Sequence, residues 1–311
     1  MEYSASPRGP AAQRLFPTDG MDMTRMLTAI AAVLVATAAV AQTASAKPSP
    51  RGGPPPTAVQ EGSASSQVSG DGSTTTATAT CPGGTKAAGG GFDTPSSADV
   101  FGLVYESVRV SHHAWRSSVQ LFDPGAPSQL TLTTFVYCRK HIPETRTSAS
   151  TVPTDGQLAV GPTASARCPA GMVALAGGFR MPPPLVHPSV TALFFDSLRD
   201  GVSGWDARVV TGPAGPSSFT SEAYCTDRVT APAEAYGASP PNESDLTRST
   251  ASASCPAGLS PAAGGFTQPD SDPSSFFFVD SSKRVGDSWQ ISGLHVGSEP
   301  PATLDAAAYC G

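Results

Sequence analysis

The sequence predicts an all-β protein made of three repeats of a short antiparallel β unit, each stapled by one disulfide. Three observations predict this class. Six cysteines recur at a regular spacing, and 31 glycines and 31 prolines among 311 residues interrupt the chain too often for helices of three turns. Between these interruptions, apolar and polar residues alternate, as in strands with one buried face.

The chain begins with a segment that is typical of exported proteins. Residues 27–40 form an uncharged apolar run that follows Arg25 and precedes the small residues 44–46. A basic start, a short apolar centre and a small-residue exit describe a secretory signal peptide. We therefore expect a secreted protein from which residues 1–46 are removed, with cleavage after Ala41 as the alternative.

Two stretches flank this export signal. Residues 1–20 do not resemble the start of a signal peptide, and a true start at Met21 or Met23 would leave them untranslated. Residues 47–75 are rich in proline, glycine and serine and contain almost no large apolar residue. This composition predicts a disordered spacer, because such a segment buries too little surface to offset its ordering entropy.

The charge balance excludes several functions. Charged residues make up 14% of the chain and the formal net charge is −6, whereas nucleic-acid binding needs a basic stripe. No glycine-rich phosphate loop opens a helical segment. The N-terminal apolar run is too short for a comfortable bilayer span. We therefore expect no nucleic-acid partner and no stable transmembrane segment after signal cleavage.

Cysteine spacing reveals the repeat. Cys81, Cys168 and Cys255 stand 87 residues apart, and each opens a Cys-Pro-x-Gly motif that leads to Gly-Gly-Phe. An aromatic–cysteine pair closes each repeat: Tyr137-Cys138, Tyr224-Cys225 and Tyr309-Cys310. One tryptophan lies in each repeat: Trp115, Trp205 and Trp289. These coincident landmarks indicate a triplicated unit. The predicted repeats cover residues 76–140, 162–228 and 250–311, joined by linkers at 141–161 and 229–249.

Each repeat is expected to contain four or five short antiparallel strands, with its tryptophan and tyrosine in the core. The clearest alternation covers residues 130–136, where Leu130, Leu132 and Val136 share one face. The paired glycines that precede the phenylalanine of each Gly-Gly-Phe motif indicate a bulge or a close backbone approach within a strand.

The cysteines are expected to form disulfides. An exported protein matures in an oxidising compartment, and six thiols allow 15 pairings. The repeat favours Cys81–Cys138, Cys168–Cys225 and Cys255–Cys310, each closing a loop of 55–57 residues. Loop entropy gives each of these bonds about 4 kcal/mol of stabilisation. No Cys-x-x-Cys pair occurs and the histidines do not repeat, so we expect no metal and no other cofactor.

Two arrangements of the repeats remain open. Three independent modules could follow one another like beads, or three units could pack about a pseudo-threefold axis. The segment from the last cysteine of one repeat to the first cysteine of the next spans 30 residues, which suits either arrangement.

The repeated motifs resemble those of known proteins. Cys-Pro-x-Gly, Gly-Phe and aromatic-Cys, three times over residues 76–311, are similar to secreted Cys/Gly-rich proteins of actinobacteria without an assigned function. The same landmarks more faintly resemble vitelline membrane outer layer protein, whose three repeats form a β-prism. This chain lacks the acidic Asp-Asp-Thr stretch of that family and has longer repeats, so the resemblance implies a fold analogy alone.

One repeated pattern suggests chemistry. A serine preceded by an acid lies eight residues before each tryptophan, at Glu106-Ser107, Asp196-Ser197 and Asp280-Ser281. A carboxylate, a hydroxyl and an exposed indole could form a sugar subsite. The alternative, which we favour, places each tryptophan in the core and each acid at a strand end, because tryptophan is highly buried on average.

The sequence therefore predicts a secreted protein that is not an enzyme and that displays three similar surfaces to an extracellular protein or glycan. The alternative is a carbohydrate-binding repeat protein that uses Trp115, Trp205 and Trp289 with the three acids. A third hypothesis is a hydrolase built where units meet, which would require unlike catalytic groups to converge at one place.

Overall fold

The computed structural model describes residues 59–311, with gaps at 71–72, 98–99, 122–129, 144, 155–158, 184–191, 212–217, 228–229, 270–273 and 298–300. The predicted signal peptide and most of the predicted spacer lie outside these described residues. The described part contains 18 strands, six from each repeat, and is all-β as predicted.

The strands follow the threefold repeat of the sequence. Repeat 1 contains β1 (Gln60–Gln67), β2 (Thr75–Thr80), β3 (Lys86–Asp93), β4 (Gly102–Ser111), β5 (Ala114–Leu121) and β6 (Thr131–Arg139). Repeat 2 contains β7 (Thr145–Pro153), β8 (Ala159–Arg167), β9 (Val173–Arg180), β10 (Ala192–Asp200), β11 (Gly204–Thr211) and β12 (Ser218–Thr226). Repeat 3 contains β13 (Ala233–Ala238), β14 (Arg248–Ser254), β15 (Pro261–Thr267), β16 (Phe276–Val285), β17 (Ser288–Val296) and β18 (Asp305–Cys310).

The first strand of each repeat lies where the sequence predicted a spacer or a linker. β1, β7 and β13 fall within 47–75, 141–161 and 229–249, and each pairs with the last strand of its own repeat. Their residues are mostly exposed or half-buried, since these strands lie at sheet edges. The polar composition of these segments therefore reflects exposure at an edge, and each repeat has six strands instead of four or five.

Each sheet combines strands from two repeats. The sheet orders are β1-β6-β3-β16-β17-β14, β2-β5-β4-β9-β12-β7 and β11-β10-β15-β18-β13. β8 lies beside β11, as β2 lies beside β5 and β14 beside β17, and completes the third sheet. The first, third and sixth strands of every repeat thus join one sheet, and its second, fourth and fifth strands join another.

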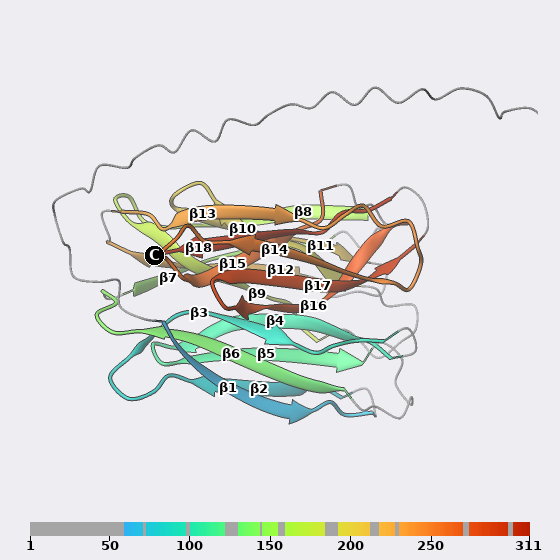
Figure 1. Ribbon diagram of the computed structural model, residues 1–311, viewed down its shortest axis with the longest axis horizontal. Helices are drawn as coiled ribbons and strands as arrows, with labels where there is room; N and C mark the ends of the chain where they lie inside the picture. The colour runs from blue at the N-terminus through green and yellow to red at the C-terminus, as the bar shows by residue number, and fades with distance from the viewer. Residues whose placement is uncertain are drawn as a thin grey trace, which may run out of the picture. The chain divides into compact units, whose positions relative to one another are not determined.

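This sharing closes the three repeats into a ring. Repeat 1 shares a sheet with repeat 2, repeat 2 with repeat 3, and repeat 3 with repeat 1. At the corners, edges of different sheets meet: β1 packs beside β2, β7 beside β8 and β13 beside β14. Figure 1 shows β1 and β2 together at the bottom of the view. Of the two arrangements left open by the sequence, the structure has three sheets about a pseudo-threefold axis, as in a β-prism.

The disulfides have the predicted pairing and join different sheets. Cys81–Cys138, Cys168–Cys225 and Cys255–Cys310 have Cα–Cα distances of 5.7, 5.5 and 5.7 Å. In each repeat the first cysteine follows the second strand and the other lies in the sixth strand, which belongs to the neighbouring sheet. Each bond therefore staples one corner of the prism.

Candidate functional site

The three tryptophans form the centre of the core. Trp115, Trp205 and Trp289 have exposed fractions of 2%, 1% and 0%. Each indole N–H donates to a serine hydroxyl of the same repeat: Trp115 to Ser107 at 2.9 Å, Trp205 to Ser197 at 3.0 Å and Trp289 to Ser282 at 3.1 Å. The polar end of every indole is thus satisfied inside the protein.

The glycine pair of each repeat makes room for this packing. A Cβ added at the first glycine of each pair would overlap an indole; at Gly90 it would overlap that of Trp115. A Cβ added at the second glycine would overlap a backbone carbonyl of the adjoining repeat; at Gly91 it would overlap that of Ser282. The same holds for Gly177, Gly178, Gly264 and Gly265. The close backbone approach predicted for Gly-Gly-Phe is therefore present.

The closing tyrosines join neighbouring repeats. Each ring packs edge-on against the tryptophan of the preceding repeat, with centroid distances of 5.3–5.4 Å: Trp115–Tyr224, Trp205–Tyr309 and Trp289–Tyr137. Each buried hydroxyl accepts a hydrogen bond from the backbone N–H of an arginine in that preceding repeat: Arg109, Arg199 and Arg284. Burial raises the pKa of all three tyrosines. We call these tryptophans, serines and tyrosines the core ring.

The acids predicted beside the serines lie apart from the indoles, in ion pairs within their own repeats. Glu106 binds Arg116 at 2.6 Å and accepts a hydrogen bond from Ser118 at 2.7 Å. Asp196 binds Arg208 at 2.5 Å and accepts a hydrogen bond from Thr267 at 2.6 Å. These carboxylates are thus occupied by side chains of the protein.

Asp280 departs from the predicted equivalence. The chain between the paired Arg284 and Trp289 is one residue shorter than that between Arg109 and Trp115 or between Arg199 and Trp205, so counting back from the tryptophan slips by one residue. Ser282, not Ser281, therefore corresponds to Ser107 and Ser197, and Asp280 occupies the β-bulge position. Its fully buried carboxylate binds Arg248 at 2.6 Å and the Ser96 backbone N–H at 2.8 Å. Burial raises its pKa, against the effect of Arg248.

The three sheets share a backbone plan but carry different charges. The residues that follow Gly-Gly-Phe are Asp93, Arg180 and Thr267, and those two places before the closing tyrosines are Phe135, Glu222 and Ala307. On one sheet Arg180 and Glu222 form an ion pair at 3.2 Å, and on another Asp93 binds Lys283 at 2.6 Å. The surfaces are therefore not chemically equivalent, which differs from the predicted three similar surfaces.

A cavity of about 190 Å³ opens at the end of the prism that carries the disulfides. Its apolar floor consists of Ala88, Leu175 and Ala262, which occupy one equivalent position in the three repeats, two residues before the first glycine of each pair, together with Ile142. Its cationic side consists of Arg139 and Lys140, with the His141 imidazole beside them. Pro143, Pro232, Tyr309, Cys310 and Gly311 complete the lining. We call this space the end cavity.

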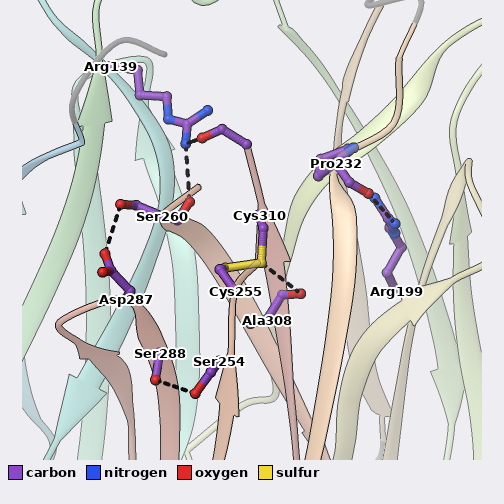
Figure 2. The surroundings of a disulfide bond; sticks show 11 residues. Arg139, Arg199, Pro232, Ser254, Cys255, Ser260, Asp287, Ser288, Ala308 and Cys310 are labelled. Carbon is purple, nitrogen blue, oxygen red and sulfur yellow. Dashed lines mark hydrogen bonds between the residues drawn. A yellow bond between two sulfur atoms is a disulfide. The ribbon is translucent and has the colours of Figure 1, made fainter. Parts of the chain in front are cut away.

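The cationic side of the end cavity comes from the connection between β6 and β7. Arg139 is buried, and its guanidinium donates hydrogen bonds to the backbone oxygen of Gly311 and, at 3.3 Å, to that of Ser260. Figure 2 shows this arginine reaching toward Ser260 beside the Cys255–Cys310 disulfide. Lys140 and His141 are exposed at the rim, where His141 has a φ of 60°. The side chains thus place positive charge over an apolar floor.

Sequence reasoning missed this site although the chain contains an indication of it. Arg139-Lys140-His141-Ile142 directly follows Cys138, while Thr226-Asp227-Arg228 follows Cys225. The adjacent pair of cations directly after the cysteine is therefore a feature of repeat 1 that repeat 2 does not share. Aligning the repeats for their differences, in addition to their shared landmarks, would have drawn attention to this segment.

Comparisons with known proteins leave the interpretation to the structure. No protein-family model matches the chain, and no curated protein matches it. Within the described residues, no group of three or more histidine, cysteine or acidic side chains is placed to hold a metal ion. No helix in the described part of the chain has the length and apolar character needed to cross a membrane.

Proposed function

We propose that this protein is an exported, non-catalytic binding protein that holds a ligand in the end cavity of a rigid prism. The observation that carries the proposal is the cavity itself. Its volume of about 190 Å³ far exceeds the roughly 10 and 20 Å³ of two smaller spaces between the sheets. Ligand sites are typically concave and combine apolar side chains with placed polar groups, and the end cavity contains both kinds of side chain.

The disulfides support the location. All six cysteines are paired, and disulfides persist in oxidising, extracellular compartments. Stapled corners also keep the elements around the cavity in place, because Cys310 belongs both to a disulfide and to the cavity lining. A preorganised site loses less entropy when it binds its ligand.

The two other hypotheses receive less support from the geometry. Carbohydrate binding rested on indole faces that could stack on a sugar, but those faces pack inside the core ring. Hydrolysis rested on acids that converge, but Glu106, Asp196 and Asp280 are each held by a different arginine. Neither proposal retains an accessible set of side chains among its predicted residues.

Protein-observed NMR on the exported chain, expected to begin at Lys47, tests the proposal. Small carboxylates, amines and neutral sugars are added separately while backbone amide shifts are followed. We expect at least one class to move the amides of Ala88, Ile142 and Leu175, which line the cavity floor. The proposal fails if no class moves them, or if shifts map only to the outer faces of the sheets.

A further inference from the structure

We infer that the outer face of the third sheet binds a neutral oligosaccharide, with Tyr236 as the platform on which a sugar ring stacks. Tyr236 does not line the end cavity, so this inference goes beyond the function proposed above. It follows from the exposure and the fixed orientation of the Tyr236 ring, from the apolar row of residues beside it, and from the contrast with the equivalent rows of the other two sheets.

The Tyr236 ring is both exposed and held in place. At 62% it is the most exposed large apolar side chain among the described residues, although it lies within β13. Its hydroxyl donates a hydrogen bond to the Glu234 carboxylate at 2.6 Å, and Glu234 is held in turn by Arg199. A tyrosine has only two side-chain torsions, so a ring that is already oriented offers a large contact area at low entropic cost.

An uncharged row of residues continues from Tyr236 across the sheet. Tyr236 pairs with Ala307 on β18, and Ala307 pairs with Gly265 on β15, so all three share one face. A Cβ at Gly265 would lie 3.2 Å from the Leu198 Cβ, so Leu198 of β10 ends the row. Neighbouring strands are about 4.8 Å apart, which makes the row about 14 Å long. In this row no side chain larger than a methyl group separates the tyrosine from the leucine, so a flat chain of a few sugar units can lie along it.

The equivalent rows of the other two sheets have a different character. In the first sheet Ser63 takes the place of Tyr236, and the row ends at the cation Lys283. In the second sheet Ala149 takes that place, and the row contains the anion Glu222. Only the third sheet therefore combines an exposed aromatic ring at this place with an uncharged row.

The surroundings of Tyr236 favour a sugar over a protein partner. A stable protein interface covers about 800 Å² on each partner around an apolar centre. The other exposed large apolar side chains of the described residues are Val110, Val202, Leu246 and Val285, and none of them belongs to the row. One aromatic ring beside small residues instead suits a pyranose, whose C–H groups meet the negative face of the aromatic ring.

The polar group beside the ring selects a neutral sugar. The Glu234 side chain is 30% exposed, whereas that of its partner Arg199 is 3% exposed, so solvent meets the carboxylate and not the guanidinium. An ionised carboxylate only accepts hydrogen bonds, which suits the hydroxyl groups of a sugar. Asp305, two residues before Ala307 on β18, adds a second acid to the same face. A sugar acid is therefore disfavoured by repulsion.

Isothermal titration calorimetry on the exported chain tests the inference with cellohexaose, mannohexaose and xylohexaose as neutral probes and hexagalacturonate as the acidic probe. We expect at least one neutral probe to bind, and to bind about tenfold more tightly than hexagalacturonate. Tyr236→Ala should weaken that binding about tenfold, whereas Tyr236→Phe keeps the ring and should weaken it about two- to threefold. Val285→Ala is the matched control, because it shortens a side chain that is 48% exposed on the first sheet. Melting temperatures show that each variant is folded.

Backbone amide shifts locate the bound sugar. We expect the neutral probe to move the amides of Gly265 and Ala307, which lie in the row. The inference is overturned if no neutral probe binds, if hexagalacturonate binds best, or if Tyr236→Ala and Val285→Ala bind the probe equally. Its failure is distinguishable from failure of the proposed cavity function, which is judged at Ala88 and Leu175 on the cavity floor. Sugar-induced shifts at the cavity floor alone would support the cavity and contradict the Tyr236 site.

Discussion

The core ring and the end cavity differ in how far they follow the threefold repeat. In the core ring, tryptophan, serine and tyrosine recur with the same contacts in all three repeats, within 0.2 Å for the indole–serine bonds. At the end cavity only the apolar floor recurs, and the cations come from a single connection. The positions that repeat hold the fold together, and the position that breaks the repeat carries accessible charge.

This difference teaches how to interpret repeated residues in such a chain. A residue that recurs at the equivalent position of every repeat has a role that is common to all repeats, here the packing of each repeat against its neighbours. Most ligands lack threefold symmetry, so a binding site is better sought at positions where the three repeats differ. The acid–serine pattern, which could also have formed a threefold sugar subsite, consists of ion pairs and indole partners.

The largest expected effect concerns a core-ring indole. Trp205→Ala removes a side chain that is 1% exposed, and we expect a loss of about 3–5 kcal/mol of unfolding free energy. Because the sheets are shared, the whole prism should melt at a lower temperature in one transition. Val202→Ala, at 55% exposure on the adjoining turn, is the control and should have little effect. Chemical denaturation measures both; a separate early transition for repeat 2 would contradict a shared core.

A smaller effect is expected from a single methyl group. Gly90→Ala places its Cβ against the Trp115 indole, and overpacking of this kind costs about 1–3 kcal/mol. Gly83→Ala in the same repeat has no atom within 4 Å of the added carbon, so its melting temperature should remain near that of the parent. Differential scanning calorimetry compares the two. Equal stability of the two variants would contradict the close packing of Gly90 against the Trp115 indole in the core ring.

The smallest change is spectroscopic and separates ring tyrosines from a surface tyrosine. Tyr236 is 62% exposed, and partial burial together with its hydrogen bond to Glu234 raises its pKa to about 12. The ring tyrosines have pKa values raised further by burial, so they should remain neutral in the folded protein.

Absorbance of the phenolate follows this titration. Raised folded-state pKa values make the unfolded state ionise first, so stability is complete below about pH 10 and declines above it. Tyr236→Phe should remove the phenolate signal that appears near pH 12 before unfolding. Ionisation of Tyr137, Tyr224 or Tyr309 ahead of unfolding would contradict their burial.

Much of this architecture was predictable from residue patterns. The spacing of cysteines predicted three repeats and the disulfide pairing, and alternation predicted strands. The cyclic exchange of strands was not predictable, because pairing between Ser281 and Asp93 depends on partners far apart in sequence that no local pattern specifies. The edge strands were missed because the serines and threonines of β1 and β7, and the small residues of β13, resemble those of a linker.

The candidate site was less accessible to sequence reasoning. The pairing of Trp289 with Ser282 depends on the length of the hairpin segment between Arg284 and Trp289, which shifts the count by a single residue. The end cavity is formed by residues from all three repeats, including Ala88, Leu175 and Ala262. Its existence follows from three-dimensional closure, whereas the cations at its rim were visible in the sequence after Cys138.

The cyclic sharing of sheets also sets the order in which the protein can reach its native state. Lys283 meets Asp93 across 190 residues of chain, and the Asp280 carboxylate meets Ser96 across 184. The sheet that joins the first and last repeats therefore cannot form until the third repeat has been synthesised. Contacts at such separation slow folding. A chain that closes only at its final repeat stays open until that repeat is present, and we expect it to become resistant to proteases in a single late step.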